Sequence, residues 1–148
     1  MAELKNEMKF EFISKSANES FARATVAAFI AQLDPTISEI ADIKTAISEA
    51  VTNCIVHAYK NRLGIVYISV KIFDNGQVII KIRDKGCGIE NVNQAMEPLY
   101  TTGGAERAGL GFAVMQSFMD NIKVISKVGK GTTITLTKNI IPRVAKNG

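Results

Sequence analysis

The chain has 148 residues, of which 47% are hydrophobic and 22% charged, and its formal net charge at pH 7 is +4. This length and apolar content are typical of one domain with a substantial core, so we expect a single domain over residues 1–148. The lysines and arginines are scattered along the chain without a dense basic block, so direct nucleic-acid binding is not indicated.

The amino-terminal residues and the cysteines bear on where the protein works. Residues 1–12, MAELKNEMKFEF, mix charged and apolar side chains and therefore predict neither a signal peptide nor a membrane span. Cys54 and Cys87 have no C-x-x-C or other zinc-ligand spacing and form no disulfide framework. We therefore expect a cytoplasmic protein with reduced thiols and no membrane association.

The chain is predicted to begin with a strand and a helix. Residues 8–12, MKFEF, alternate apolar and polar side chains, which is the pattern of a half-buried strand. Ser16 and Glu19 form an S-x-x-E capping box, and apolar residues then recur at helical spacing. The first helix is therefore expected over about residues 17–33, where Asp-Pro interrupts it.

A second capping box, formed by Thr36 and Glu39, predicts the start of another helix. The apolar stripe of this helix consists of Ile40, Ile43, Ile47, Ala50, Val51, Cys54 and Ala58. Glu49 and Asn53 project away from that stripe one turn apart, so the two side chains are neighbours that can serve one site. A solvated helix face explains an isolated E-x-x-x-N pair as well. The apolar residues that follow Asn53 favour a pair that faces a cleft.

Two β-hairpins and two helices are predicted for the rest of the chain. The four strands are expected over residues 64–73, 77–84, 122–128 and 132–138. Their turns are Asp-Asn-Gly at 74–76 and Gly-Lys-Gly at 129–131. Between the hairpins we expect a glycine-rich loop, a short helix from about residue 90, a second glycine-rich loop and a helix ending near residue 119.

The first glycine-rich loop begins where a predicted strand runs into Asp84, which is followed by Gly86 and Gly88. The carboxylate offers a hydrogen-bond acceptor and the glycines let the backbone come close to a ligand, so the amino group of a base would suit this site. A strand-ending turn explains the same residues. Cys87 has no accompanying histidine and is interpreted as a small loop residue and not a nucleophile.

The second glycine-rich loop is predicted to be a mobile lid. Its glycines are Gly103, Gly104, Gly109 and Gly111. Gly109-Leu110-Gly111 is expected to lead into the amino terminus of a helix, whose free amides and positive dipole end would attract phosphate. Neither a P-loop nor a Rossmann G-x-G-x-x-G after a first strand occurs, so a nucleotide would have to bind in another way.

In chain order, four short motifs resemble the nucleotide-binding boxes of the GHKL superfamily, the ATP-binding fold of gyrase, Hsp90, histidine kinases and MutL. They are E-x-x-x-N at 49–53, D-x-G-x-G at 84–88, G-L-G-F at 109–112 and G-K-G-T at 129–132. NESFARATVAAFIAQLDPT, the EAVTN helix and EPLYTT extend the resemblance to the anti-sigma serine kinases over essentially the whole chain. The resemblance implies an α/β, Bergerat-type two-layer sandwich, with helices on one face of a mixed, mostly antiparallel sheet.

The resemblance also implies a function for each motif residue. Asn53 would hold Mg²⁺ through its side-chain oxygen, and Glu49 would be the general base for a serine hydroxyl. Asp84 would accept the adenine amino group, with Thr132 nearby through water. The remaining residues expected to bind ATP or ADP are Gly86, Gly88, Thr101, Thr102, Arg107, Gly109, Leu110 and Gly111. Arg107 would reach the terminal phosphate, or it is an ordinary exposed arginine.

The lid and one histidine depart from what the resemblance implies. Relatives often carry serine and methionine where this chain has Ala108 and Leu110, and the Gly103-Gly104 segment is more glycine-rich, so lid closure and nucleotide exchange are expected to differ. His57 is interpreted as a helix-face histidine beside the cleft. Histidine kinases place their phosphoacceptor on a separate dimerisation domain, for which this chain has no room.

The implied partners are proteins. One is a sporulation sigma factor of the sigma F type, which the protein would sequester, and the other is an anti-anti-sigma factor of the SpoIIAA type, whose serine it would phosphorylate. Arg23 would lie on the face that meets both partners, or it is an ordinary exposed helix residue. Relatives act as homodimers, which we expect here by resemblance alone.

Two classes of function remain open at this point, together with a third that is weaker. The protein is a serine kinase that also binds sigma, or a binding module in which nucleotide only switches partner affinity. Retention of Glu49 favours the kinase, because a switch has no use for a base. A stand-alone histidine-kinase-like fragment would instead carry acid-labile phosphate on histidine or aspartate.

Overall fold

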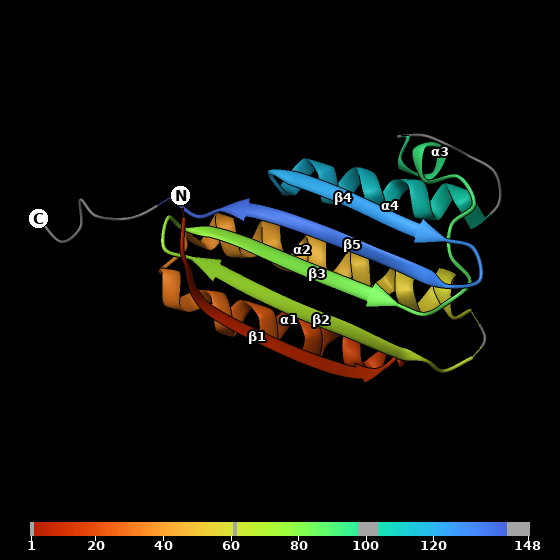
Figure 1. Ribbon diagram of the computed structural model, residues 1–148, viewed down its shortest axis with the longest axis horizontal. Coiled ribbons are helices and arrows are strands. Elements are labelled where there is room, and N and C mark those ends of the chain that lie inside the picture. Colours follow the sequence, from red (N-terminus) through yellow and green to blue (C-terminus); the bar gives the residue numbers. More distant parts are fainter. Residues whose placement is uncertain (1, 61, 98–103, 142–148) are drawn as a thin grey trace, which may run out of the picture.

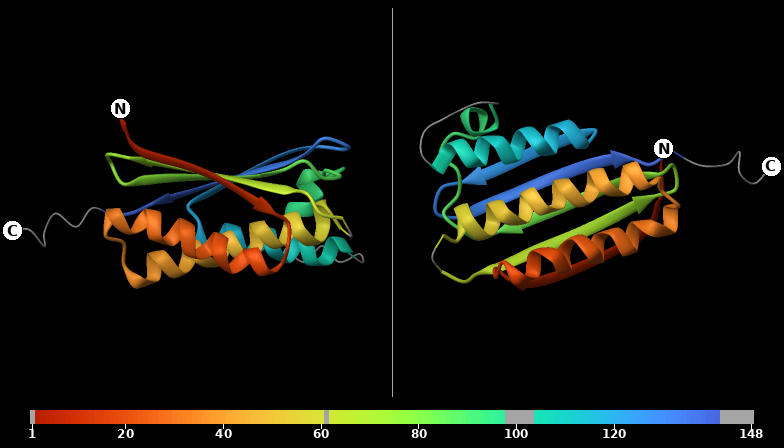
Figure 2. Two further views of the ribbon diagram at one scale, coloured as in Figure 1. Left: turned by 90° about the horizontal axis from the view of Figure 1, so that it is seen from below. Right: turned by 180° about the vertical axis from the view of Figure 1, so that it is seen from behind.

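A computed structural model describes residues 2–60, 62–97 and 104–141 of the protein, and for residues 104–110 the helical backbone alone. A five-stranded sheet forms one layer and helices on one of its faces form the other (Figures 1 and 2). The strands are β1 (Leu4–Ile13), β2 (Ile65–Phe73), β3 (Gln77–Asp84), β4 (Asn121–Lys127) and β5 (Gly131–Asn139). The helical segments are α1 (Ala17–Ile30), η1 (Ala31–Leu33), α2 (Ile37–Thr52), η2 (Asn53–Ala58), α3 (Val92–Met96) and α4 (Gly104–Phe118). The expected α/β two-layer fold is confirmed.

The strand order is β1-β2-β3-β5-β4, and every pairing between these described strands is antiparallel. The expected mixed sheet is therefore antiparallel throughout the described residues. Both predicted hairpins are confirmed, and their tight turns contain Gly76 at φ +90° and Gly129 at φ +81°. Because β1 adds beside β2 and β5 adds beside β3 in opposite directions, no parallel neighbours arise.

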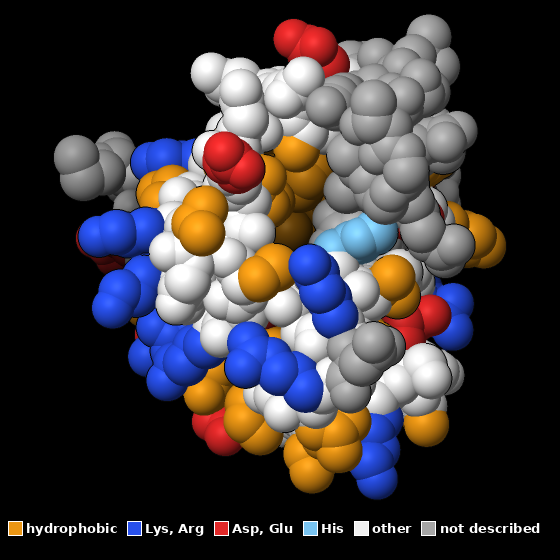
Figure 3. All heavy atoms as spheres, turned by 90° about the vertical axis from the view of Figure 1, so that its right-hand side faces the viewer, with side chains coloured by type: hydrophobic (Ala, Val, Ile, Leu, Met, Phe, Trp, Pro, Cys, Tyr) orange, Lys and Arg blue, Asp and Glu red, His pale blue; other side chains and the backbone are white. Residues whose placement is uncertain are grey.

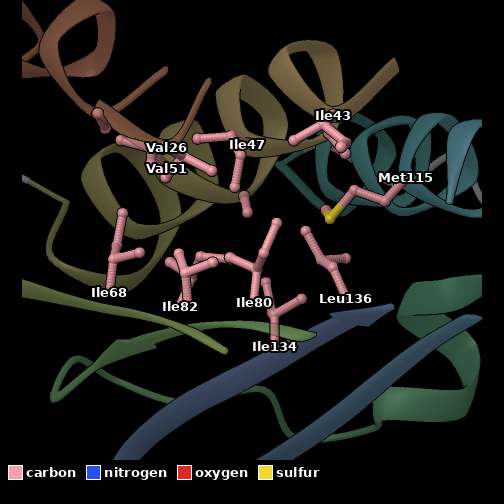
Figure 4. Packing of buried hydrophobic residues seen from close by; sticks show 14 of the residues in the cluster. Val26, Ile43, Ile47, Val51, Ile68, Ile80, Ile82, Met115, Ile134 and Leu136 are labelled. Carbon is pink, nitrogen blue, oxygen red and sulfur yellow. The ribbon is translucent and has the colours of Figure 1, made fainter. Parts of the chain in front are cut away.

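The core lies between the sheet and the helices. Side chains at every second position of β2 and β3 are buried, as the period-two pattern of these strands requires. Figure 4 shows Ile80, Ile134 and Leu136 of the sheet pointing toward Ile47 of α2. Each such aliphatic side chain contributes about 1.5–3 kcal/mol when it is fully buried. None of the described helices is both long and apolar enough to cross a lipid bilayer.

Only one of the two predicted capping boxes forms. The Thr36 hydroxyl accepts from the Glu39 N–H at 2.9 Å and the Glu39 carboxylate accepts from the Thr36 N–H at 2.8 Å, which confirms the start of α2. The Ser16 box was wrong, because the Ser16 backbone is already helical and its side chain caps nothing. The Glu19 carboxylate instead accepts a hydrogen bond from Ser48 of α2 at 3.1 Å.

The predicted second helix changes its winding at Asn53. Residues Asn53–Ala58 form a π-helix, in which the Tyr59 N–H donates to the Cys54 carbonyl at 3.0 Å. The wider turn keeps both Cys54 and Ala58 in the buried set. π-Helical turns are rare and occur frequently at functional sites. Apolar periodicity did not predict this change, because a single inserted step leaves the pattern before it intact.

Candidate functional site

A cavity of about 360 Å³ opens between the π-helix, the loop after β3 and α4. Its lining includes Asn53, His57, Gly88, Phe112, Thr132 and Ile134. Figure 3 shows this hollow, with hydrophobic side chains at its floor and the histidine at its edge. A cleft of this size, mainly apolar and with a few convergent polar groups, is suited to a small organic ligand.

Asp84 provides a buried hydrogen-bond acceptor at one end of the cavity. It follows the buried side chains of β3 in the period-two series and pairs with Thr132 of β5. One carboxylate oxygen, Oδ1, accepts from the Gly86 N–H at 2.9 Å and from the Thr132 N–H at 3.2 Å. Burial raises the pKa of this carboxyl group, and the two backbone donors partly oppose that rise. The site is suited to a ligand that presents a hydrogen-bond donor.

Cys54 lies against Asp84 and is 1% exposed. Burial raises the pKa of its thiol well above the usual range, and the charge of Asp84 raises it further. The thiol is therefore a neutral hydrogen-bond partner of the carboxylate and not a nucleophile. Sequence reasoning placed Cys54 in an apolar stripe and missed this contact, because nothing local connects residues 54 and 84.

Glu49 and Asn53 converge below Gly111 of α4. A methyl group added at Gly111 would lie 3.2 Å from Glu49 Oε2 and 3.3 Å from Asn53 Oδ1. The predicted proximity of the two side chains is confirmed, and α4 closes over them without a side chain of its own. Asn53 Nδ2 is buried without a hydrogen-bond partner among the described residues. A buried polar group left in this way indicates a ligand contact.

The donors at this point fit a magnesium ion that is held mostly by a nucleotide. No group of three or more His, Cys, Asp or Glu side chains within residues 2–60, 62–97 and 111–141 could hold a metal ion. Mg²⁺ needs only one or two protein oxygens when phosphates and waters complete its shell. The Asn53 amide can present its oxygen, since crystallographic and computed amides are readily interchanged by a flip.

The glycines of the first and third motifs hold loops of the protein together. A side chain at Gly86 would collide with the Ala58 carbonyl, and one at Gly88 with the Lys127 carbonyl. Gly131, at φ +127°, packs in the same way against the Asp84 carbonyl. The structure therefore requires these glycines for backbone packing around the cavity, a reason that the predicted ligand clearance did not include.

Ser126 of β4 was missed by sequence reasoning. Its hydroxyl lies 2.7 Å from the Thr132 hydroxyl and accepts from the Ile89 N–H at 2.7 Å. Ser126 and Thr132 are paired across β4 and β5, so strand register brings them together. The alternation of β4 could have placed Ser126 on the polar side of the hairpin but not beside this loop.

The lid predictions fall largely outside the described part of the chain. Thr101, Thr102 and Gly103 lie outside the described residues, as do the side chains of Arg107, Ala108, Gly109 and Leu110. The expected helix start at Gly109–Gly111 is wrong, because α4 begins at Gly104 and these residues lie inside it. A helix-interior glycine costs only about 1 kcal/mol, and buried Phe112 and Met115 anchor the helix beyond it.

Two other predicted residues are placed plainly. His57 lines the cavity from the π-helix, as expected for a helix-face histidine beside the cleft. Arg23 lies on α1 and is not part of the cavity lining. Its Nε atom is 2.9 Å from Glu19 Oε2, and the side chain is 39% exposed. Contact of Arg23 with a partner stays a prediction.

The sequence matches a domain family described as "Histidine kinase-like ATPase domain" over residues 13–138. An anti-sigma F factor of Caldanaerobacter subterraneus subsp. tengcongensis is 60% identical over 139 residues, which cover 93% of this chain and 96% of that protein. An anti-sigma F factor of Clostridium acetobutylicum is 56% identical over 136 residues, covering 91% and 94% of the two chains.

Solved structures show the same fold at lower identity. The RsbU and RsbW domains of a Mycobacterium tuberculosis protein match with a TM-score of 0.67 and 21% identity, over 92% of this chain and 33% of that one. A histidine kinase domain from Erythrobacter litoralis matches with a TM-score of 0.55 and 18% identity, over 82% and 60% of the two chains. With the domain match and the close relatives, these findings confirm the resemblance: the chain belongs to the anti-sigma F factor family and carries a histidine kinase-like, ATP-binding ATPase domain.

Proposed function

We propose that this protein sequesters a sigma factor of the sigma F type and phosphorylates a serine of its anti-anti-sigma antagonist, using MgATP. Family membership supports the sigma partner. The convergence of Glu49 and Asn53 below Gly111 carries the kinase proposal, because a base and a phosphate-side ligand are needed at one point. The protein works in the cytoplasm, where both partners are found, and acts as a homodimer.

The nucleotide lies with its base at the Asp84 end of the cavity. The Asp84 carboxylate accepts a hydrogen bond from the adenine amino group, and Thr132 contacts the base through water. The carboxylate is fixed for this contact, because the Gly86 and Thr132 backbone groups already hold one of its oxygens. The apolar side chains of Phe112 and Ile134 line the space for the ring.

The phosphates lie toward Asn53 and α4. Bound Mg²⁺ neutralises charge on the phosphates, and the Asn53 side-chain oxygen holds it there. Glu49 accepts the proton of the substrate serine hydroxyl while the serine oxygen attacks the γ-phosphorus and ADP leaves. In the lid, Arg107 contacts the terminal phosphate, and Thr101, Thr102, Gly109 and Leu110 line the phosphate path. Arg23 belongs to the surface that meets both protein partners.

The kinase is tested by measuring the intact mass of a candidate anti-anti-sigma protein after incubation with MgATP. We expect one phosphate on serine with the wild-type protein and none with Glu49→Gln, whose amide has nearly the same shape but accepts no proton. Glu7→Gln, on the exposed strand β1, is the matched control and keeps full activity.

Two outcomes would contradict the kinase. The absence of phosphate, with MgATP binding confirmed in the same sample, would leave a binding module in which nucleotide switches affinity for sigma. Phosphate that is lost in acid would indicate transfer to histidine or aspartate. Equal activity of Glu49→Gln and wild type would remove Glu49 from the mechanism.

A further inference from the structure

Lys60 has an unusual backbone conformation beside the cavity. It is the second residue after the π-helix and has φ +53°, a value that only Asp34 shares among the described non-glycine residues. The left-handed region costs a residue with a Cβ about 1–3 kcal/mol. Such strain persists where the surrounding structure fixes the chain, and it occurs often at ligand sites.

The chain is fixed immediately before Lys60. The Tyr59 hydroxyl donates to the Ile65 carbonyl at 2.6 Å and accepts from the Lys85 N–H at 2.7 Å, so the 4%-exposed ring is held at both sides. The Ala58 carbonyl accepts from the Cys87 N–H at 3.0 Å. The backbone therefore reaches Lys60 in one direction, and the left-handed turn decides where its side chain goes.

That side chain lines the cavity, although the residue itself is exposed. Lys60 follows Asn53 and His57 along the same lining, whereas Asp84 lies in the deeper part that receives the base. In Figure 3 a Lys or Arg side chain lies beside the histidine at the edge of the hollow. A positive charge at the wet rim of an apolar cavity is suited to the charged end of a ligand whose flat end is buried.

We propose that Lys60 binds the phosphate groups of the nucleotide and thereby favours nucleotides over nucleosides at this site. The inference rests on the proposed binding of adenine nucleotide in the cavity. Lysine binds phosphate as a point charge at the end of a flexible chain, so it can follow the phosphates of both ATP and ADP. None of the four glycine and E-x-x-x-N motifs contains this residue.

The test compares Lys60→Asn with Lys60→Arg by calorimetric binding of ATP, ADP and adenosine at low and high salt. Asparagine tolerates the left-handed backbone, so Lys60→Asn removes the charge without disturbing the turn. We expect this variant to bind ATP and ADP roughly 5- to 20-fold more weakly, with a smaller salt dependence, as for one charge-assisted contact at a partly exposed site. Adenosine affinity stays within about twofold of wild type, as for the loss of an exposed charge that the ligand does not touch.

The controls separate this inference from the proposed function. Lys60→Arg keeps most of the ATP affinity, and Lys15→Asn, an exposed loop lysine outside the cavity lining, leaves all three affinities unchanged. If Lys60→Asn binds ATP and ADP as wild type does, or loses adenosine equally, the inference is overturned while nucleotide binding stands. If the wild-type protein binds neither ATP nor adenosine, the proposed function itself fails.

Discussion

At the scale of single residues, Asp84 is set to read the edge of a base. Its carboxylate only accepts hydrogen bonds, while an amide at the same place would present a donor. The backbone N–H groups of Gly86 and Thr132 would hold the oxygen of that amide and turn its NH₂ group toward the ligand.

We therefore expect Asp84→Asn to weaken ATP binding by at least about tenfold, because two donors would face each other. Inosine triphosphate, which has a carbonyl in place of the amino group, should lose much less or gain. Competition binding of the two nucleotides measures the change, with Asp74→Asn in the β2–β3 turn as control. The same loss for both nucleotides would remove Asp84 from base recognition.

The raised pKa of Asp84 predicts a pH dependence of binding. The pKa lies above its ordinary value of 3.8 because the carboxyl group is buried. The ionised form accepts the amino group, so ADP affinity should fall as the pH drops through this raised pKa. The same shift makes the contribution of Asp84 to the unfolding free energy greatest below pH 3.8 and lost as the pH rises through the folded pKa. ADP titrations between about pH 7 and 4.5 test this, and a slope unchanged in Asp84→Asn would contradict it.

At the scale of elements, the cavity depends on how the π-helix meets the loop after β3. The Cys87 N–H donates to the Ala58 carbonyl, and the Cys87 carbonyl accepts from the Gly129 N–H at 2.8 Å. One loop is thus held between the end of a helix and a hairpin turn. This arrangement keeps Asp84 and Asn53 at a fixed separation across the site.

We expect Gly86→Ala to lower the unfolding free energy by about 1–3 kcal/mol, because its methyl group would collide with backbone at Ala58. ATP affinity should fall with it, since the loop carries the base contact. Gly129→Ala is the matched control: space is open around it, and its φ of +81° alone should cost about 1 kcal/mol. Denaturant unfolding compares the two, and a harmless Gly86→Ala would contradict this packing.

At the scale of the whole molecule, one core joins the sheet to α1, α2 and α4. Ile80 of the central strand is fully buried beneath the helices, whereas its neighbour Ile79 lies on the open face of the sheet and is partly exposed. The two residues are chemically identical and differ only in the face to which the pleat directs them.

Ile80→Ala should therefore lower the unfolding free energy by about 2–5 kcal/mol in a single transition, through lost burial and the cavity left behind. Ile79→Ala should cost less than about 1.5 kcal/mol, because its side chain buries less apolar surface on folding. Chemical denaturation followed by circular dichroism measures both. Similar losses for the two variants would mean that the open face is covered as well as the inner one.

The sequence by itself determined the elements whose signals are local. The alternation in β2 and β3, the Asp-Asn-Gly turn and the Thr36 box depend on residues within a few positions of one another. The pairing of Glu49 with Asn53 is of this kind too, because one helical turn brings them together. The four motifs also identified the family, since their order along the chain is retained whatever the packing.

Tertiary structure decided the features that join distant segments. Ser16 lost its capping partner because Ser48 and Arg23 bind Glu19. The π-helix, the early start of α4 and the contact of Cys54 with Asp84 arise where one element must fit against another. Local propensities differ by about 1 kcal/mol or less per residue, whereas buried contacts between elements contribute more, so packing prevails wherever the two disagree.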